Sequence, residues 1–246
     1  MPAPTLYSGG WSIDSETSAG TGNVTKNPDA TTIGAIAYVI GATGSASTPS
    51  LATTMTYGNV ALAQVINNNA INSNAPQRGR RATIYWMTPL DSARADNVFR
   101  WAFPAEATQW LIGVTLLNRG GGDNRLKIND TETYTRDSGA PATSQSQMPL
   151  TTPPGFALWC SLCDNSLVEY VSGATTIQTL FSGSTHAAAS YRANSSSITV
   201  GHQRSFGVGP WVASSALFGG ERVGGGGQGG TPRQRVRRGN RRRLSV

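Results

Sequence analysis

Short apolar runs, each closed by glycine, proline, asparagine, aspartate or serine, follow one another along most of the chain. IGAIAYVI (33–40) is the first of them, and the loop GATGSASTPS follows it. NVFRWAF (97–103) alternates aromatic with polar or small side chains, as in a strand with one buried face. QWLIGVTLL (109–117) is apolar almost throughout, which predicts a central strand that is buried on both faces.

The remaining runs of this kind are ATIYWMTP (82–89), NRLKIND (124–130), GFALWCSLC (155–163), SLVEYV (166–171), TTIQTLF (175–181), SSITVGH (196–202) and WVASSALF (211–218). VALAQVI (60–66) fits either a strand or a short helix, and the polar stretch NNNAINSNAP is expected to end it. About ten short strands at near-regular spacing, without a long amphipathic helix, predict an all-β fold. We expect a β-sandwich or a β-barrel.

The chain divides into four segments by composition. Residues 1–32 are irregular and polar, and we interpret them as an N-terminal arm or edge element that precedes the β-sandwich domain of residues 33–219. Residues 220–232 form a glycine-rich linker that contains GGGGQGG. Such a run neither holds a helix nor packs a core, so we expect a flexible tether. Residues 233–246 form an arginine-rich C-terminal arm.

The net charge of the chain is concentrated in that arm. The whole chain has 20 Lys+Arg and 13 Asp+Glu. Seven arginines of the arm account for the excess, since 20 − 7 leaves 13 basic residues against 13 acidic residues in 1–232. They are Arg233, Arg235, Arg237, Arg238, Arg241, Arg242 and Arg243. The body is formally neutral and charged residues make up only 13% of the chain, which favours a surface that meets protein neighbours.

The arm contains arginine and no lysine, and guanidinium groups pair bidentately with phosphate or carboxylate. Two binding interpretations follow: the arm contacts packaged nucleic acid, or it docks into acidic grooves of neighbouring subunits. A third interpretation is a solvated tail with no specific partner. A weaker second patch consists of Arg78, Arg80 and Arg81 in QRGRR. These arginines also fit charged residues that flank an apolar strand and protect it from aggregation.

Cys160 and Cys163 have the C-x-x-C spacing of zinc sites and redox pairs. Zinc needs four ligands, and the spacing of the only two histidines, His186 and His202, matches no zinc finger. The surrounding FALWCSLC predicts a strand, in which positions three apart point to opposite faces. We therefore interpret both as ordinary strand cysteines and predict neither a metal site nor a cofactor.

Four aspartates in or beside predicted loops are candidates for a calcium site: Asp123, Asp130, Asp137 and Asp164. Aspartates at such positions more often form turns, because their side chains bond nearby backbone amides. Asp130 and Glu132 are the nearest approach to a glycosidase carboxylate pair, and NDTET is more simply interpreted as a solvated turn. The sequence has no nucleophile elbow, phosphate-binding loop or helical zinc motif, so we predict that the protein is not an enzyme.

Neither a membrane nor a secretion pathway is indicated. No apolar run approaches the roughly 20 residues that a transmembrane helix requires. The opening MPAPTLYSGGWS lacks the basic and apolar regions of a secretion signal. We expect a protein without a membrane partner.

The stretch DNSLVEYVSG (164–173) resembles a hairpin of the laminin-G/concanavalin-like family: a turn, an alternating strand that ends Tyr-Val, then a small residue and glycine. TIYWMTP is similar to a family strand in which a tryptophan shortly precedes proline, and SSSITVGHQRSFGVGPWVASSALFGG resembles the closing section. The resemblance covers roughly 82–220 and implies an antiparallel β-sandwich of the concanavalin-like kind. An eight-stranded jelly roll of the viral type is the nearest alternative. The Glu-x-Asp-x-x-Glu strand of the family's glycosidases is missing from this sequence. Such modules and jelly rolls recur in tailed-phage virion proteins, so the resemblance implies a place in a virion.

These observations together predict a virion structural protein without enzymatic activity. The first interpretation is a bacteriophage capsid decoration (cement) protein, or a head–tail or tail component, which its arginine arm anchors to other virion proteins in a larger, homo-oligomeric assembly. One alternative is the major coat protein of a small virus, whose basic arm binds the packaged genome. Another is a carbohydrate-binding adsorption module with exposed tryptophan, tyrosine and loop aspartate.

Overall fold

The structure is a computed structural model, and it describes residues 3–16, 20–43, 54–72, 78–88, 95–103, 108–136, 144–151, 154–164, 167–182, 185–204 and 210–223. Within these ranges the chain forms β-strands and no helix, which confirms the all-β prediction. Accordingly, no helix long and apolar enough to cross a membrane is found there. Every strand pair is antiparallel, as predicted for the sandwich.

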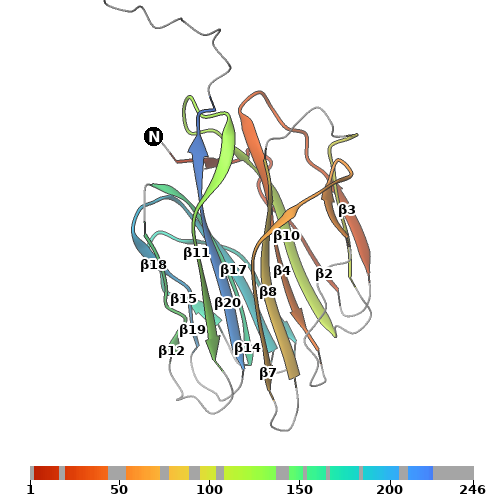
Figure 1. Cartoon of the computed structure of the whole chain (residues 1–246). Helices are drawn as coiled ribbons and strands as arrows, with labels where there is room; N and C mark the ends of the chain where they lie inside the picture. The colour runs from red at the N-terminus through yellow and green to blue at the C-terminus, as the bar shows by residue number, and fades with distance from the viewer. Residues whose placement is uncertain are drawn as a thin grey trace, which may run out of the picture.

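Two main sheets, one from each half of the chain, form the centre of the molecule (Figure 1). The first consists of β1 (Thr5–Leu6), β2 (Ser12–Glu16), β4 (Thr32–Ala42), β7 (Ala63–Asn72), β8 (Arg78–Met87) and β10 (Gln109–Asn118). Its order is β1-β10-β4-β8-β7, and β2 also pairs with β10. The second consists of β11 (Arg125–Arg136), β14 (Gly155–Asp164), β16 (Thr175–Ser182), β17 (Thr185–Ser195) and β20 (Trp211–Glu221), in the order β11-β20-β14-β17-β16.

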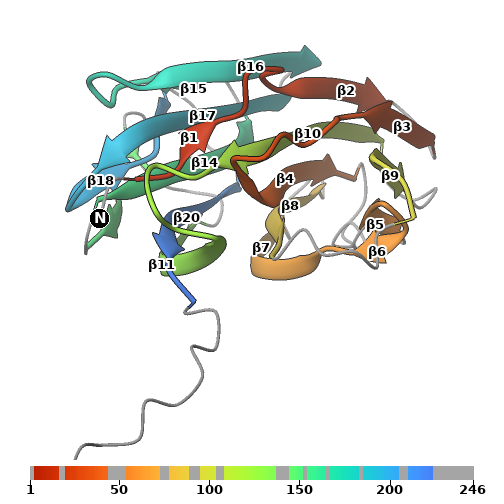
Figure 2. The ribbon, with the colours of Figure 1, turned by 90° about the horizontal axis from the view of Figure 1, so that it is seen from above.

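Smaller sheets cover the outer faces of the two main sheets (Figure 2). Over the first main sheet lies the sheet β3-β9-β5-β6, made of β3 (Thr21–Thr25), β5 (Thr54–Tyr57), β6 (Val60–Ala61) and β9 (Val98–Ala102). Over the second main sheet lie the sheet β12-β19-β15 and the pair β13-β18, made of β12 (Ser144–Gln145), β13 (Met148–Leu150), β15 (Leu167–Glu169), β18 (Ile198–Val200) and β19 (His202–Arg204).

The main sheets pack face to face through one continuous apolar core. Alternate residues of β4 and β14 point into it, among them Tyr38 and Ile40 from the first sheet and Leu158 and Leu162 from the second. All of these side chains are buried. Because each buried side chain of this size contributes about 1.5–3 kcal/mol, this interface is a major source of stability.

The opposite faces of the main sheets are buried as well. Trp110 and Ile112 of β10 pack with Phe99 of the outer sheet β3-β9-β5-β6. On the other side, Trp159 of β14 packs with Met148 of β13. Every residue of β10 except its last is buried, so the prediction of a two-sided central strand over 109–117 is confirmed.

Three elements differ from the sequence-based expectation. The segment 60–66 is strand, and β7 continues through the asparagines that were expected to end it. The side-chain amide of Asn68 donates to the carbonyl oxygens of Tyr134 (2.7 Å) and Ala213 (3.0 Å), so this buried asparagine fastens β7 to β11 and β20. Residues 129–133, interpreted as a turn, lie inside β11, which makes that interpretation wrong.

The third element is β17, which the sequence pattern does not predict. Its centre is HAAASY, whose small side chains lack the bulky, β-branched character of typical strands. It is nevertheless paired on both sides, with β14 and with β16. Most of its side chains are buried, so alanine here serves close packing between layers.

Candidate partner-binding residues

The end of the described chain is fastened to the start of β11. The side-chain amide of Asn124 donates to the Val223 carbonyl oxygen (3.0 Å), and the Val223 N–H donates to the side-chain oxygen of Asn124 (3.0 Å). The Asn124 N–H also donates to the Glu221 carbonyl oxygen (3.1 Å). The point at which the following segment leaves the body is therefore held by hydrogen bonds.

Glycines 219 and 220 belong to β20, whereas the sequence pattern places the linker over 220–232. A Cβ atom on Gly220 would overlap the carboxylate of Asp123, and one on Gly219 would overlap the side-chain amide of Asn129. Glycine is required at both positions because two polar side chains lie directly against the backbone. The folded body thus reaches Val223, and the rest of the predicted linker, 224–232, lies outside the described residues.

The arginine-rich arm also lies outside the described residues. Its predicted binding residues are Arg233, Arg235, Arg237, Arg238, Arg241, Arg242 and Arg243. Their role as a partner-binding or nucleic-acid-binding segment stays a prediction. What the structure contributes is the position of Val223, the last described residue before the predicted linker and arm, beside the connection between β10 and β11.

Three exposed arginines lie near the ends of the strands β10, β11 and β20, and none of them was among the predicted site residues. Arg119 and Arg125 lie at the two ends of the connection from β10 to β11. Arg222 follows β20, and a methyl group on Gly122 would lie 4.0 Å from its Nη1 atom. They are scattered singly along the sequence, and the pairing of Arg125 with Glu221 brings Arg125 close to Arg222, the residue that follows Glu221.

The second predicted patch does not form one exposed surface. Arg80 is 1% exposed, and its guanidinium group donates to the carboxylate of Asp164 on β14 (2.5 Å) and to the Gly79 carbonyl oxygen (3.0 Å). Arg81, the next residue of β8, points to the other face, where partial burial lowers the pKa of its guanidinium group. The side chain of Arg78 lies outside the described residues. The expectation of an external role is corrected for Arg80, because its charge is neutralised inside the fold.

Cys160 and Cys163 lie on β14 and are unbridged and buried, as the strand interpretation requires. Cys160 belongs to the core between the main sheets, and Cys163 faces the outer layer beside Trp211. Burial raises the pKa of each thiol to about 12. Both groups therefore stay protonated at neutral pH and are poor nucleophiles and metal ligands.

The acidic candidates for a calcium site do not converge. Asp164 is paired with Arg80, and Asp123 is buried against Gly220. Asp130 accepts hydrogen bonds from the N–H (2.7 Å) and hydroxyl (3.2 Å) of Thr151. Asp137 lies outside the described residues, and among the described ones no group of three histidine, cysteine, aspartate or glutamate residues is arranged to hold a metal ion.

A buried polar cluster around His202 was not predicted from the sequence. His202 of β19 is 1% exposed, with its Nδ1 atom 2.7 Å from the hydroxyl oxygen of Ser161 and its Nε2 atom 3.2 Å from that of Ser190. A carboxylate oxygen of Glu169 lies 3.6 Å from Nε2. The cluster therefore joins β14 and β17 of the main sheet to β15 and β19 of the outer sheet.

The chemistry of this cluster is structural. Burial lowers the pKa of His202 to about 3, so the imidazole is neutral at physiological pH, and burial raises the pKa of Glu169. Both serine side chains are fully buried, which keeps a substrate from reaching their hydroxyl groups in this conformation. A neutral imidazole between two hydroxyls satisfies both ring nitrogens and fastens the outer sheet to the main one.

Comparisons with known proteins add no relative to this picture. No family model, no curated protein and no solved structure matches the chain. The resemblance to the laminin-G/concanavalin-like family therefore stays a prediction.

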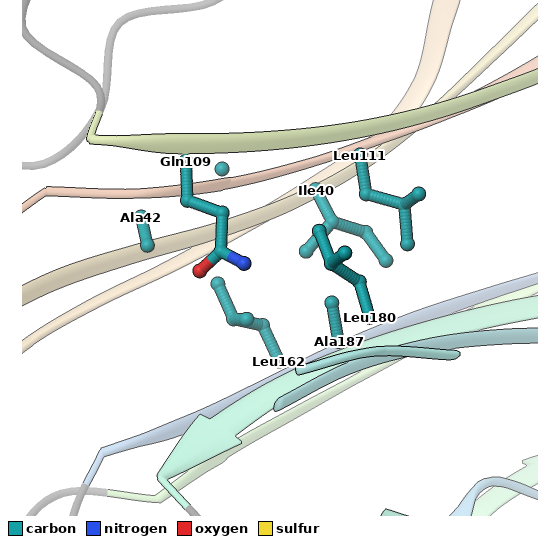
Figure 3. Close-up of a pocket in the computed structure, with 8 residues that line it drawn as sticks. Ile40, Ala42, Gln109, Leu111, Leu162, Leu180 and Ala187 are labelled. Carbon is teal, nitrogen blue, oxygen red and sulfur yellow. The ribbon is translucent and has the colours of Figure 1, made fainter. Parts of the chain in front are cut away.

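A narrow gap lies between the main sheets at the seam where β16 faces β10 (Figure 3). Ile40, Leu111, Leu162 and Leu180 line it, and the side-chain amide of Gln109 points into it. The gap is too narrow to hold a water molecule. It separates packed side chains and offers no room for a ligand.

Proposed function

We propose that this protein is a non-enzymatic structural component of a virus particle, built from jelly-roll modules and attached to its surroundings by an arginine-rich arm. The observation that carries the proposal is the nested pairing of strands, which occurs once in each half of the chain. The jelly roll has eight strands in two sheets and is an architecture of viral capsid proteins and of lectins.

In the first half, eight strands follow one another if β6 and β7, which one residue separates, are counted as one. They are β2, β3, β4, β5, β6/β7, β8, β9 and β10. The first pairs with the last, β2 with β10. Moving inward, β3 pairs with β9, β4 with β8, and β5 with β6. Such nested pairing is what results when one long hairpin is wound into two facing sheets, which supports a jelly-roll assignment.

In the second half, β11 pairs with β20 and β14 with β17. Between these pairs, β12 pairs with β19 and β13 with β18, as one interrupted strand pair. The fourth strand, β15, pairs with β19, as β5 pairs with β9 in the first half. The same nesting therefore supports the same assignment for residues 125–221.

The described part of the chain gives the lectin alternative little support. Carbohydrate modules stack sugars on exposed aromatic side chains, whereas all six tryptophans and all seven tyrosines of this chain are buried or partly buried. The large hydrophobic side chains that are exposed in the described part of the chain are Ile13, Val168 and Val223, and none is aromatic. The viral branch of the jelly-roll architecture is the better candidate.

Within the virion, we propose a coat subunit whose arm contacts packaged nucleic acid. Arg119, Arg125 and Arg222 are exposed, and they add positive charge to the side of the body on which Val223, the last described residue before the predicted tether, lies. Seven arginines on a glycine-rich tether suit phosphate contacts without sequence readout. The second candidate, a decoration or head–tail component, would instead dock the same arm into acidic grooves of neighbouring subunits.

The test compares the full chain with a chain that ends at Val223 and with a full-length variant that has glutamine at the seven arm arginines. Binding of a fluorescent single-stranded oligonucleotide is measured by anisotropy from about 50 to 300 mM salt. For ten phosphate contacts, seven from the arm and three from Arg119, Arg125 and Arg222, log affinity should fall with log salt at a slope of about −7, and both altered chains should retain a slope of about −2.

Equal salt slopes for all three proteins would contradict the nucleic-acid role. The docking candidate is supported if the chain ending at Val223 binds nucleic acid like the full chain but fails to join particles that already contain their genome. Triple substitution of Arg119, Arg125 and Arg222 by glutamine should reduce the slope of the full chain by about 2.

A further inference from the structure

The two halves of the chain have the same strand order. In the first main sheet the order β2-β10-β4-β8-β7 corresponds, strand for strand, to β11-β20-β14-β17-β16 in the second. The outer sheets correspond in the same way, with β3-β9-β5 matching β12-β19-β15. Each half therefore places its own main sheet and its own outer sheet by the same path.

The correspondence extends to individual registers. Trp110 is the second residue of β10 and stands opposite Gly41 of β4, whereas Trp211 opens β20 and stands opposite Cys163 of β14. Both indole rings are fully buried on the outer face of their sheet. Equivalent strands thus start from an aromatic side chain in the same position.

A β-bulge occurs at the same place in both edge strands. Val65 is the extra residue where β7 pairs with β8, and Ile177 is the extra residue where β16 pairs with β17. On the neighbouring strands, the bulges begin at Tyr85 and Ser190. Through β4, Tyr85 aligns with Val114, which lies four residues after Trp110. Through β14, Ser190 aligns with Ser215, which lies four residues after Trp211. Bulges are specific features of a fold, so their coincidence indicates equivalent modules.

The two main sheets do not pack with strict two-fold symmetry: β7 and β8 contact β20 closely, whereas the equivalent approach of β16 and β17 to β10 is wider. On one seam β7 contacts β11 and β20. On the opposite seam its counterpart β16 faces β10, with Leu180 beside Leu111 (Figure 3), and Trp11 before β2 contacts Tyr191 of β17. The strands β4 and β14, which are each other's counterparts, contact each other near the centre. The equivalent modules therefore meet face to face across a shared apolar core, with one seam closer than the other.

We infer that the chain is a fused pair of equivalent eight-stranded modules, and that the face between its main sheets is an interaction surface whose partner is a second such module. The connection 119–124 then serves as a tether and is not needed for the association. The apolar face, with Ile36, Tyr38 and Leu158 at its centre, together with the Arg80–Asp164 ion pair, holds the modules together. This inference is independent of the virion proposal.

The test introduces a protease recognition sequence at Gly120–Gly122 of the full-length chain, where the glycines are exposed or partly exposed. After cleavage in native buffer, the two fragments should elute as one 1:1 species with the mass of the uncut protein. The unfolding midpoint should become dependent on protein concentration. Fragments separated in denaturant and then mixed should regain the same complex.

A matched control places the same site between Ser172 and Gly173, in an exposed turn within the second module. This cut separates β14 from β16, β17 and β20, so its fragments should reassemble poorly after separation. The inference is wrong if the fragments of the 120–122 cut dissociate in native buffer, or if they reassemble no better than those of the control.

A circular permutant provides a second test if the insertion disturbs folding. It keeps every residue, runs from 121 to 246 and continues from 1 to 120. Because the connection 119–124 is dispensable under this inference, the permutant should have the circular dichroism spectrum and elution volume of the parent. A permutant that fails to fold would overturn the inference.

Discussion

Arg80 and Asp164 form a buried ion pair that joins the two main sheets across 84 residues of sequence, from β8 to β14. The hydroxyl of Thr185, on the neighbouring β17, lies 3.4 Å from the same guanidinium nitrogen. The pair lies near the interface where the modules meet, and both partners are nearly inaccessible to water. Removal of one partner leaves an uncompensated buried charge, which is far more destabilising than loss of a surface ion pair.

Arg80→Ala is therefore expected to lower the free energy of unfolding by about 3–5 kcal/mol, measured by urea denaturation. Arg81→Ala, on the other face of the same strand, is the control and should cost roughly 1 kcal/mol or less. The double variant Arg80→Met/Asp164→Leu should recover most of the loss, because neither charge stays buried. A loss below about 1 kcal/mol for Arg80→Ala would mean that water reaches the pair.

Gly41 lies beneath the indole ring of Trp110 on the adjacent strand, and a Cβ atom there would overlap the ring. Gly41→Ala should cost about 1–3 kcal/mol of unfolding free energy, because the buried ring has no free space into which it can move. Gly122→Ala is the control, since the nearest atom to its added methyl group is 4.0 Å away on a flexible side chain. Equal stability of the two variants in thermal denaturation would show that β10 shifts to accommodate the methyl group.

Acid should weaken the fold through His202. In the unfolded chain this histidine takes up a proton below pH about 6.5, whereas in the folded protein burial lowers its pKa to about 3. The unfolded state therefore binds more protons between these values, and stability falls as the pH falls through that window. The maximal slope for one proton is about 1.4 kcal/mol per pH unit.

The measurement compares urea midpoints of the wild type and of His202→Gln between pH 7 and 5. The variant should be less stable at pH 7, yet it should lose less stability on acidification, because its unfolding takes up about one proton fewer. Glu169 changes stability in the opposite direction on acidification, because burial raises its pKa and the folded state takes up a proton first. Its contribution is present in both proteins and therefore does not enter the comparison. The half-buried His186, changed to glutamine, is the control and should leave most of the slope in place. Parallel pH profiles for wild type and His202→Gln would contradict this account.

The two cysteines should react with DTNB only when the protein unfolds. Burial keeps both thiols protonated and sterically protected, with pKa values of about 12. We expect labelling at pH 8 to be slower than for a free thiol by orders of magnitude, and urea to release both groups together. Rapid labelling of one cysteine in native buffer would indicate local opening of β14.

The sequence pattern predicts the all-β architecture and most of the long strands, because bulky alternating side chains dominate them. It fails where small or polar residues form strands for reasons outside the local segment. β17 depends on alanines that let two layers approach, and β7 continues because Asn68 bonds to strands that lie more than 60 residues away in sequence. Local propensity carries no record of either contact.

The candidate binding residues also divide into features that composition reveals and features that depend on contacts distant in sequence. The neutral body and cationic arm are evident from composition, whereas the inward direction of Arg80 and the approach of Arg125 to Arg222 depend on strand pairing. The internal equivalence is also hidden, because apart from Trp110 and Trp211 the corresponding positions described above share burial and register but not residue type. Gly41 corresponds to Cys163, and Val65 to Ile177.

Burial of both broad faces of the two main sheets restricts how other molecules can meet this protein. On the described part of the chain, a neighbour meets the outer layers, the edge strands and the strand tips. The loop residues at the tips change without disturbing a packed interior. The body can therefore diversify its neighbours through the tips of its strands while its centre stays constant.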